Sequence, residues 1–206
     1  LRERTIPQFY LATIALILLA SIVAVRLVGG PFGEMRPYLD LFCMGVAFLL
    51  LETKHIVQFA LLFGTTWLVN ALVFIGVLLS VLLAIAVTRR VTITRPVLLY
   101  PALFAALALA WLVPGSALLD LPIVPRFVAA VTLAFLPIFT ANLIFARRFK
   151  DTADSTAAFG ANLLGAMVGG LLEYTSLVIG YRNLVLVVAA VYGAALVSGR
   201  RYLNSV

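Results

Sequence analysis

The residues most able to do chemistry lie in one short stretch, LLLETKHIVQF, residues 49–59. It places a carboxylate (Glu52), an amine (Lys54) and the only histidine of the chain (His55) between two strongly apolar runs. Ionisable side chains inside an apolar run are rare and often carry protons or bind polar solutes. At helical spacing, Glu52 and His55 lie about 60° apart, whereas Lys54 lies about 200° from Glu52. Glu52 and His55 can therefore share one site, and Lys54 needs a different partner.

Two interpretations of this motif stay open. In the structural one, Glu52 is protonated or hydrogen-bonded to a neighbouring helix and only stabilises the packing. In the functional one, Glu52 and His55 contact an ion, a proton or a polar substrate. A variant of the functional interpretation breaks the helix at residues 52–55, so that freed backbone groups line a cavity. A charge at the centre of a membrane helix costs about 2.5–3.5 kcal/mol on insertion scales, so the three groups cannot all stay charged and unpaired.

A second group of polar and small residues lies in FGANLLGAMVGGLLEYTS, residues 159–176. Asn162, Gly165, Gly169 and Glu173 fall on one face at helical spacing. Gly165 and Gly169 form the small-xxx-small pattern, which predicts close packing against another helix. Glu173 shares that face, so we interpret it as a third polar contact. Glu52 and Glu173 can approach each other in the middle of the membrane.

Other polar residues inside apolar runs have simpler roles. We interpret Asn70, Asn142 and Asn162 as hydrogen-bonding contacts between helices, each worth about 0.6 kcal/mol on average. Asn142 and Asn162 lie near the same ends of their helices and can bond each other. The same interpretation applies to Gln58 and Thr140. Pro137 predicts a kink in its helix.

The elements that must position these residues are membrane helices. Of the 206 residues, 64% are hydrophobic and 11% are charged, against about 45–50% and about 25% in a soluble domain. A small globule cannot bury so large an apolar fraction. We therefore predict an all-α integral membrane protein of one domain, residues 1–206, with seven crossings. The seven apolar runs that reach or approach the length of a crossing are 9–28, 39–63, 66–87, 97–113, 127–146, 157–179 and 184–198.

The basic residues predict the orientation. The net charge is +7, but the lysines and arginines are spread over short loops, which is typical of membrane proteins and not of nucleic-acid binding. Seven crossings put Arg36, Arg89, Arg90, Arg95, Arg147, Arg148, Lys150, Arg200 and Arg201 on one side, and Arg2, Arg4, Arg126 and Arg182 on the other. The positive-inside rule makes the first side cytoplasmic. We expect a bacterial inner-membrane protein with its N terminus outside and its C terminus in the cytoplasm.

Sequence motifs for catalysis or metal binding are missing. The chain has no Gly-rich phosphate loop, no HExxH, no Gly-x-Ser-x-Gly and only one cysteine, Cys43. With one histidine and one cysteine, a His/Cys metal site is not expected. We predict no catalytic residue and no cofactor. The chain begins at Leu1 without a signal peptide, and we expect it to be a piece of a longer protein.

Two segments resemble a known family. GVAFLLLETKHIVQFALLFGTTWLVNALVFIGVLL, residues 45–79, and STAAFGANLLGAMVGGLLEYTSLVIGYRNL, residues 155–184, resemble helix pairs in the membrane region of bacterial spermidine-synthase-like multi-pass proteins. The resemblance covers residues 45–197 and implies a six-helix half of a major-facilitator-like transporter, residues 39–198, with residues 9–28 as an extra leading helix. It also implies a homodimer or a missing N-terminal half. Family members often carry an aminopropyltransferase-type soluble domain, and nothing in this chain matches its Gly-rich cofactor motif.

These observations lead to one functional hypothesis and one alternative. The hypothesis is a transporter-like module in the lipid bilayer that binds or moves a small polar solute or a proton, with Glu52, His55 and Glu173 as its contacts. The alternative is a non-transporting membrane anchor or regulatory domain for a spermidine-synthase-like soluble enzyme domain outside this chain.

Overall fold

A computed structural model describes residues 8–28 and 30–203, and this part of the chain is helical with no strand. The predicted all-α architecture is confirmed. Five helical segments are long and apolar enough to cross a membrane: Phe32–Phe63, Trp67–Arg90, Ile123–Lys150, Ser155–Ile179 and Leu184–Leu203. Two further apolar helices, Ala15–Leu27 and Pro96–Leu112, are shorter. Each of the seven predicted crossings thus corresponds to helix, five of them at full membrane length.

The described helices follow one another with short connections. In chain order they are α1 (Gln8–Val28), α2 (Phe32–Met35), η1 (Arg36–Tyr38), α3 (Leu39–Phe63), α4 (Trp67–Arg90), η2 (Pro96–Leu98), α5 (Leu99–Leu112), α6 (Gly115–Leu119), α7 (Ile123–Lys150), α8 (Ser155–Leu172), η3 (Glu173–Thr175), α9 (Ser176–Ile179) and α10 (Leu184–Leu203).

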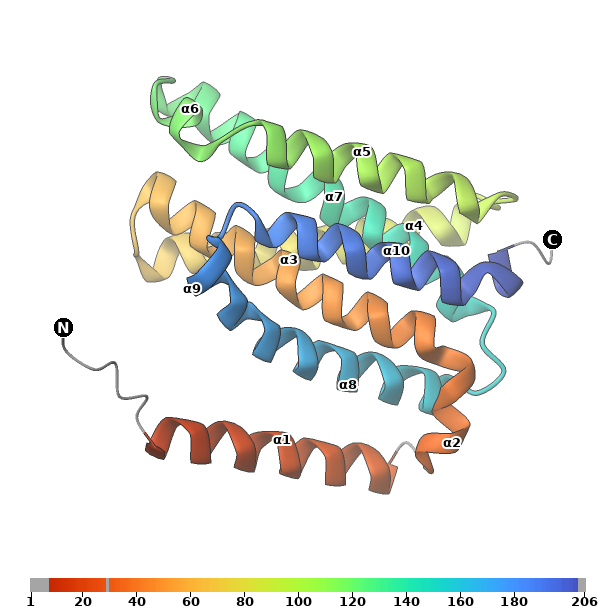
Figure 1. The fold of residues 1–206 in the computed structure, drawn as a ribbon. Coiled ribbons are helices and arrows are strands. Elements are labelled where there is room, and N and C mark those ends of the chain that lie inside the picture. Colours follow the sequence, from red (N-terminus) through yellow and green to blue (C-terminus); the bar gives the residue numbers. More distant parts are fainter. Residues whose placement is uncertain (1–7, 29, 204–206) are drawn as a thin grey trace.

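The long helices run alternately in opposite directions, so that the start of α1 and the end of α10 lie at opposite ends of the bundle (Figure 1). Helix α3 is central and packs against α8, α10, α4 and α7. Helix α5 covers α7 and α10, and α1 lies on the outside against α8. The LLLETKHIVQF stretch, residues 49–59, therefore lies in the helix with the most neighbours.

Local signals explain where the helices begin and end. The Thr66 side chain accepts a hydrogen bond from the backbone N–H of Val69 at 3.3 Å and caps α4. Asp154 caps α8 by accepting from the N–H groups of Thr156 and Ala157 at 2.9 and 3.0 Å. Helix α3 stops at Gly64, whose φ of +96° is open to glycine and strained for other residues.

The outer faces of the bundle are apolar. On α4, Leu78 and Leu82 are each 62% exposed, and many neighbouring side chains on this helix are also exposed hydrophobics. A contiguous apolar surface of this kind is unstable in water and suits a lipid environment, where helices satisfy their own backbone groups. Composition, helix length and surface together identify a multi-pass membrane protein.

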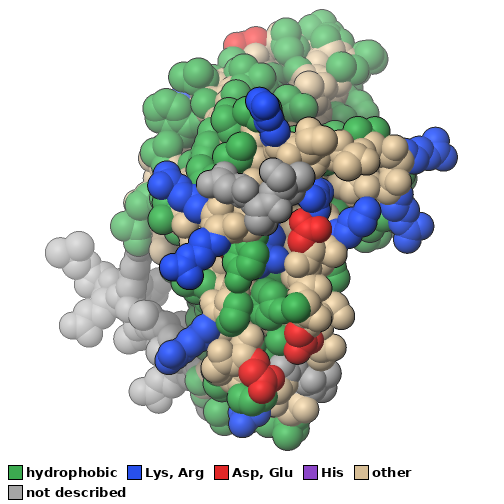
Figure 2. Space-filling view, turned by 90° about the vertical axis from the view of Figure 1, so that its right-hand side faces the viewer, with side chains coloured by type: hydrophobic (Ala, Val, Ile, Leu, Met, Phe, Trp, Pro, Cys, Tyr) green, Lys and Arg blue, Asp and Glu red, His purple; other side chains and the backbone are tan. Residues whose placement is uncertain are grey.

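Positive charge gathers at one end of the bundle, where α4, α7 and α10 end (Figure 2). We call this the basic end. It holds ten of the described lysines and arginines: Arg26 in the last turn of α1, and Arg36, Arg89, Arg90, Arg95, Arg147, Arg148, Lys150, Arg200 and Arg201. In the described part of the chain, the opposite end has only Arg126 and Arg182; the predicted contributions of Arg2 and Arg4 fall outside the described residues.

Candidate functional site

Helix α3 runs without interruption from Leu39 to Phe63 and so includes the whole LLLETKHIVQF stretch, residues 49–59. The expectation of a break or re-entrant turn at residues 52–55 is therefore wrong. The segment contains no glycine or proline between residues 46 and 63 that would weaken the helix. Thr53 turns its hydroxyl back onto its own helix and donates to the carbonyl of Leu49 at 3.0 Å. The backbone here is satisfied internally, so any site must be built from side chains.

Lys54 lies on the face of α3 away from Glu52 and finds its partner on the same helix. Its ammonium donates a hydrogen bond to the Gln58 side-chain oxygen at 2.5 Å. Both side chains are buried, with exposed fractions of 3% and 4%. The i, i+4 spacing makes this bond possible within one helix turn. Gln58 thus accepts a hydrogen bond from the buried amine, and Lys54 does not pair with Glu52 or His55.

His55 is fully buried, and neither ring nitrogen has a hydrogen-bond partner within the described residues. It lies on a stripe of α3 between Phe48 and Phe59. The ring of Phe59 packs against Phe135 of α7 with centroids 6.1 Å apart, so the stripe faces α7.

The level of His55 along α7 follows from these contacts. At one end of the stripe, Phe48 lines a cavity together with Asn142 of α7. At the other end, the Phe59 ring packs against Phe135. Because α3 and α7 run in opposite directions, His55 is level with the stretch of α7 between Phe135 and Asn142, which contains Pro137. Proline has no N–H, so the backbone carbonyl of Leu133 lacks its usual helical donor. An unpartnered imidazole and a carbonyl without its helical donor thus occur in the same part of the bundle.

Glu52 lies on the same stripe as His55 and is half-buried. It forms no hydrogen bond or ion pair with a described residue, His55 included. The two side chains share a face as expected, but no direct bond joins them. Within the part of the chain that the structure describes, no fixed donor holds the Glu52 carboxyl group.

Helices α3 and α8 run in the same direction and pack through glycines. A β-carbon on Gly165 would lie 2.0 Å from the carbonyl oxygen of Phe42, and one on Gly169 would lie 2.6 Å from that of Val46. A β-carbon on Gly45 would lie 2.1 Å from the carbonyl oxygen of Asn162. The two backbones are in direct contact along this face, as small residues allow.

This register brings the two carboxylates to one level. Val46 meets Gly169, and the next turn of α3, at Leu49, meets Gly170. One further turn along both helices places Glu52 level with Glu173. Glu173 is half-buried and makes no hydrogen bond or ion pair with a described residue. The contacts give the common level, and no bond joins the two side chains.

The helix break in this region is in α8 and not in α3. The α-helix ends at Leu172, and Glu173 begins a 3-10 turn that ends at Thr175 before α9 continues. The Thr175 hydroxyl donates to the carbonyl of Leu172 at 2.6 Å and satisfies part of the interrupted backbone. A short 3-10 stretch inside a longer helix often marks a hinge or strain. Glu173 is therefore the first residue of an irregular turn inside a membrane crossing.

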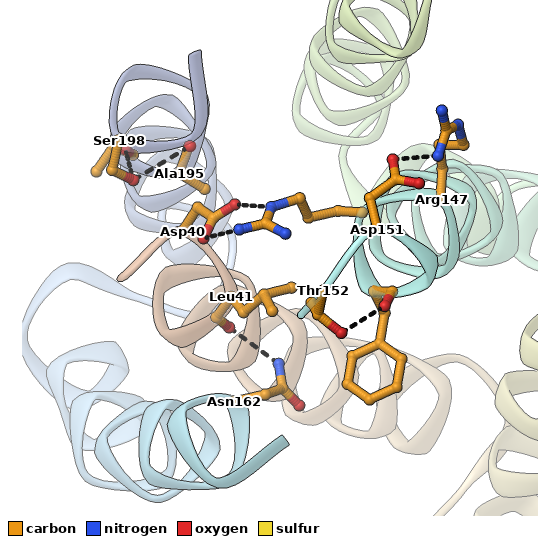
Figure 3. A network of polar contacts seen from close by, with 11 residues as sticks. Asp40, Leu41, Arg147, Asp151, Thr152, Asn162, Ala195 and Ser198 are labelled. Atoms are coloured by element: carbon orange, nitrogen blue, oxygen red, sulfur yellow. Dashed lines mark hydrogen bonds and ion pairs between the residues drawn. The ribbon is translucent and has the colours of Figure 1, made fainter. Parts of the chain in front are cut away.

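The asparagines do not bond each other, so that expectation is wrong. Asn162 donates its amide to the carbonyl of Leu41 at 3.0 Å, which ties α8 to α3 (Figure 3). Asn142 is buried, and its amide nitrogen has no partner. Both asparagines line one cavity of about 190 Å³ together with Tyr192. Asn70 is exposed on the surface of α4, away from any such contact.

Sequence reasoning missed a buried ion pair at the basic end, between Asp40 and Arg148. The guanidinium of Arg148 donates to the carboxylate of Asp40 at 2.6 Å and 3.4 Å, joining α7 to α3 (Figure 3). The two side chains are 3% and 2% exposed. The guanidinium carbon also lies 3.9 Å from the centroid of the Tyr202 ring. The sequence prediction places Arg148 among the loop charges; the missed signal is Asp40, a carboxylate just inside an apolar run.

The arrangement offers proton-binding and hydrogen-bonding groups and no evident metal site. In the part of the chain that the structure describes, no three His, Cys, Asp or Glu side chains are grouped closely enough to hold a metal ion. A carboxyl group, an imidazole and a second carboxyl group from two adjacent helices can bind a proton or a solute that donates hydrogen bonds. In comparisons with known proteins, no family model, curated protein or solved structure matches the chain. The resemblance to spermidine-synthase-like membrane regions stays a prediction.

Proposed function

We propose that this chain is a transporter-like membrane module in which Glu52, His55 and Glu173 bind or relay a proton or a small polar solute. The observation that carries the proposal is the fully buried His55 with two unpartnered ring nitrogens. A buried polar group without a partner costs about 1–3 kcal/mol. Such groups are uncommon in folded proteins and call for an explanation, of which a ligand or proton that completes the bonding is one.

Two openings reach the neighbourhood of these residues. The cavity beside Asn142 and Asn162 extends to Phe48, one turn from Glu52. A larger groove of about 530 Å³ between α1 and α8 is lined by Leu49 on α3 and by Tyr174, the neighbour of Glu173. These spaces support the proposal because they give a small molecule a way toward the level of the two carboxyl groups.

The test uses the fact that the chain has one histidine. In protein labelled with ¹⁵N-histidine and purified in detergent, every imidazole signal belongs to His55. We expect the signal to move between pH 5 and 8 or on addition of spermidine or other small polar solutes, because a bound proton or solute completes its hydrogen bonds. Glu52→Gln and Glu173→Gln should abolish or strongly weaken that response while the thermal unfolding transition is kept.

Glu34→Gln is the matched control, because it makes the same chemical change at an exposed glutamate of α2 outside the site. It should leave the His55 response unchanged. A wild-type signal that responds to neither pH nor solute, with Glu52→Gln and Glu173→Gln only lowering stability, would overturn the proposal.

The alternative is a non-transporting anchor or regulatory domain for a soluble enzyme domain. The direct backbone contact between α3 and α8 at Gly45, Gly165 and Gly169 suits an anchor that does not change shape, although a transporter half that moves as one body suits it equally. In the transporter proposal, the second half of the transporter comes from a second copy or from another segment of a longer chain. Light scattering of the detergent-solubilised protein distinguishes a dimer from a monomer.

A further inference from the structure

A second site lies at the basic end, in a groove between α4, α7 and α8. Its volume is about 510 Å³, within the range of about 300–1,000 Å³ typical of ligand sites. Three helices line the groove. The lining residues are Val81 and Ile85 of α4, Phe145 and Phe149 of α7, and Phe159 of α8. Phe145 and Phe149 stack with centroids 5.5 Å apart. This lining is hydrocarbon and aromatic and suits an acyl chain.

Two cations lie at the mouth of the groove. Arg89 from the last turn of α4 and Lys150 from the last turn of α7 both line it. Both side chains are exposed, and neither makes an ion pair or hydrogen bond with a described residue. The neighbouring Arg147, by contrast, is held by Asp151 and by the carbonyl of Ile93. The mouth therefore presents uncompensated positive charge.

The inner end of the groove contains an unpartnered donor. Asn142 is 7% exposed, and its amide nitrogen has no hydrogen-bond partner. It lines both the groove and a cavity of about 190 Å³, so the two spaces lie next to each other. Asn142 precedes Lys150 by two helix turns, about 12 Å along α7. An ester carbonyl bound below a charged head group can accept a hydrogen bond from this amide.

We propose that this groove is a binding site for an anionic phospholipid, with the phosphate at Arg89 and Lys150 and one acyl chain between Phe145 and Phe159. A zwitterionic lipid offers the same chains but a second, positive group, which meets repulsion at the mouth. Basic pockets between membrane helices at the cytoplasmic side are known to select anionic head groups. The site is independent of Glu52, His55 and Glu173 and stands whether or not the chain transports a solute.

The experiment titrates lipid into the delipidated, detergent-solubilised protein and follows the thermal unfolding transition. Phosphatidylglycerol and phosphatidylcholine with identical chains are compared, together with inorganic phosphate. We expect phosphatidylglycerol to raise the transition temperature at lower concentration than phosphatidylcholine. Arg89→Gln with Lys150→Gln should weaken the apparent affinity for phosphatidylglycerol about 25-fold, at about fivefold for each cation removed.

The control is Arg200→Gln with Arg201→Gln, which removes the same charge from exposed positions at the basic end outside the groove. This double variant should still be stabilised by phosphatidylglycerol at lower concentration than by phosphatidylcholine. Ala146→Phe fills the groove but keeps both cations, and it should weaken long-chain lipid binding. If that variant does not fold, Val81→Phe replaces it. Equal stabilisation by both lipids, equal losses in both double variants, or full stabilisation by inorganic phosphate alone would each overturn the proposal.

Discussion

At the scale of single residues, the Asp40–Arg148 pair is the contact on which the basic end depends. Asp40 comes from the first turn of α3 and Arg148 from the last turn of α7. Gly199 of α10 lets the carboxylate approach, because a β-carbon there would lie 3.1 Å from an Asp40 carboxylate oxygen. With Tyr202 over the guanidinium, one ion pair connects three helices.

Removing one partner of this pair should be costly, because the other charge stays buried and uncompensated. We expect Arg148→Gln or Asp40→Asn to lower the free energy of unfolding by about 3–5 kcal/mol. The double change Asp40→Leu with Arg148→Met should recover most of the loss, since a packed apolar pair has no charge to compensate. Denaturant unfolding in mixed micelles, followed by circular dichroism, measures these differences.

The neighbouring residue is a matched control. Arg147 pairs with Asp151, whose side chain is 44% exposed, and surface pairs of this kind contribute about 0–1 kcal/mol. Arg147→Gln also removes the hydrogen bond to the carbonyl of Ile93, so it should cost about 1–2 kcal/mol, still less than Arg148→Gln. If Arg147→Gln and Arg148→Gln prove equally destabilising, burial of the Asp40–Arg148 pair is not what stabilises this end.

At the scale of elements, α3 and α8 form the close-packed pair that sets the level of Glu52 against Glu173. Gly165 has no space for a side chain, since its β-carbon would lie 2.0 Å from the Phe42 backbone. Gly193, on α10, has nothing within 4 Å of its β-carbon position. Close packing therefore requires glycine at position 165, whereas the space around Gly193 admits a side chain.

The substitutions Gly165→Ala and Gly193→Ala should have opposite effects. Gly165→Ala forces the helices apart and should destabilise the protein by about 1–3 kcal/mol, the usual cost of overpacking. Gly193→Ala should be stabilising by up to about 1 kcal/mol, because alanine is the better helix former. Thermal unfolding in one detergent compares them, and a stabilising Gly165→Ala would disprove the close contact.

Much of this element pair could be predicted from the sequence, and some of it could not. The spacing of Gly165 and Gly169 predicts a close helix contact because small residues are the only ones that permit it. The 3-10 turn at Glu173 has no such signal, because no proline or glycine marks it within Glu173–Thr175. Nor could spacing show that Asn162 bonds the Leu41 carbonyl, because that depends on which helix lies beside which.

At the scale of the whole molecule, hydropathy was informative because lipid demands long, continuous apolar helices. The expected all-α membrane architecture followed from this demand. The ion pair between Asp40 and Arg148 was missed because the two residues are 108 positions apart and only the packing of α3 against α7 brings them together. The prediction also places Arg148 in a loop, although a residue in the last turn of a helix can point inward, as Arg148 does.

The orientation in the membrane gives the last prediction, because the basic end should face the cytoplasm. Single cysteines are introduced into a Cys43→Ser background in bacterial cells. Thr92→Cys and Ala153→Cys probe exposed loops at the basic end, and Thr65→Cys and Ser116→Cys probe exposed positions at the other end. A membrane-impermeant maleimide should label the second pair in intact cells and the first pair only after permeabilisation. The reverse pattern would mean the opposite orientation, and different labelling within one pair would contradict the alternating helix directions on which the common level of Glu52 and Glu173 rests.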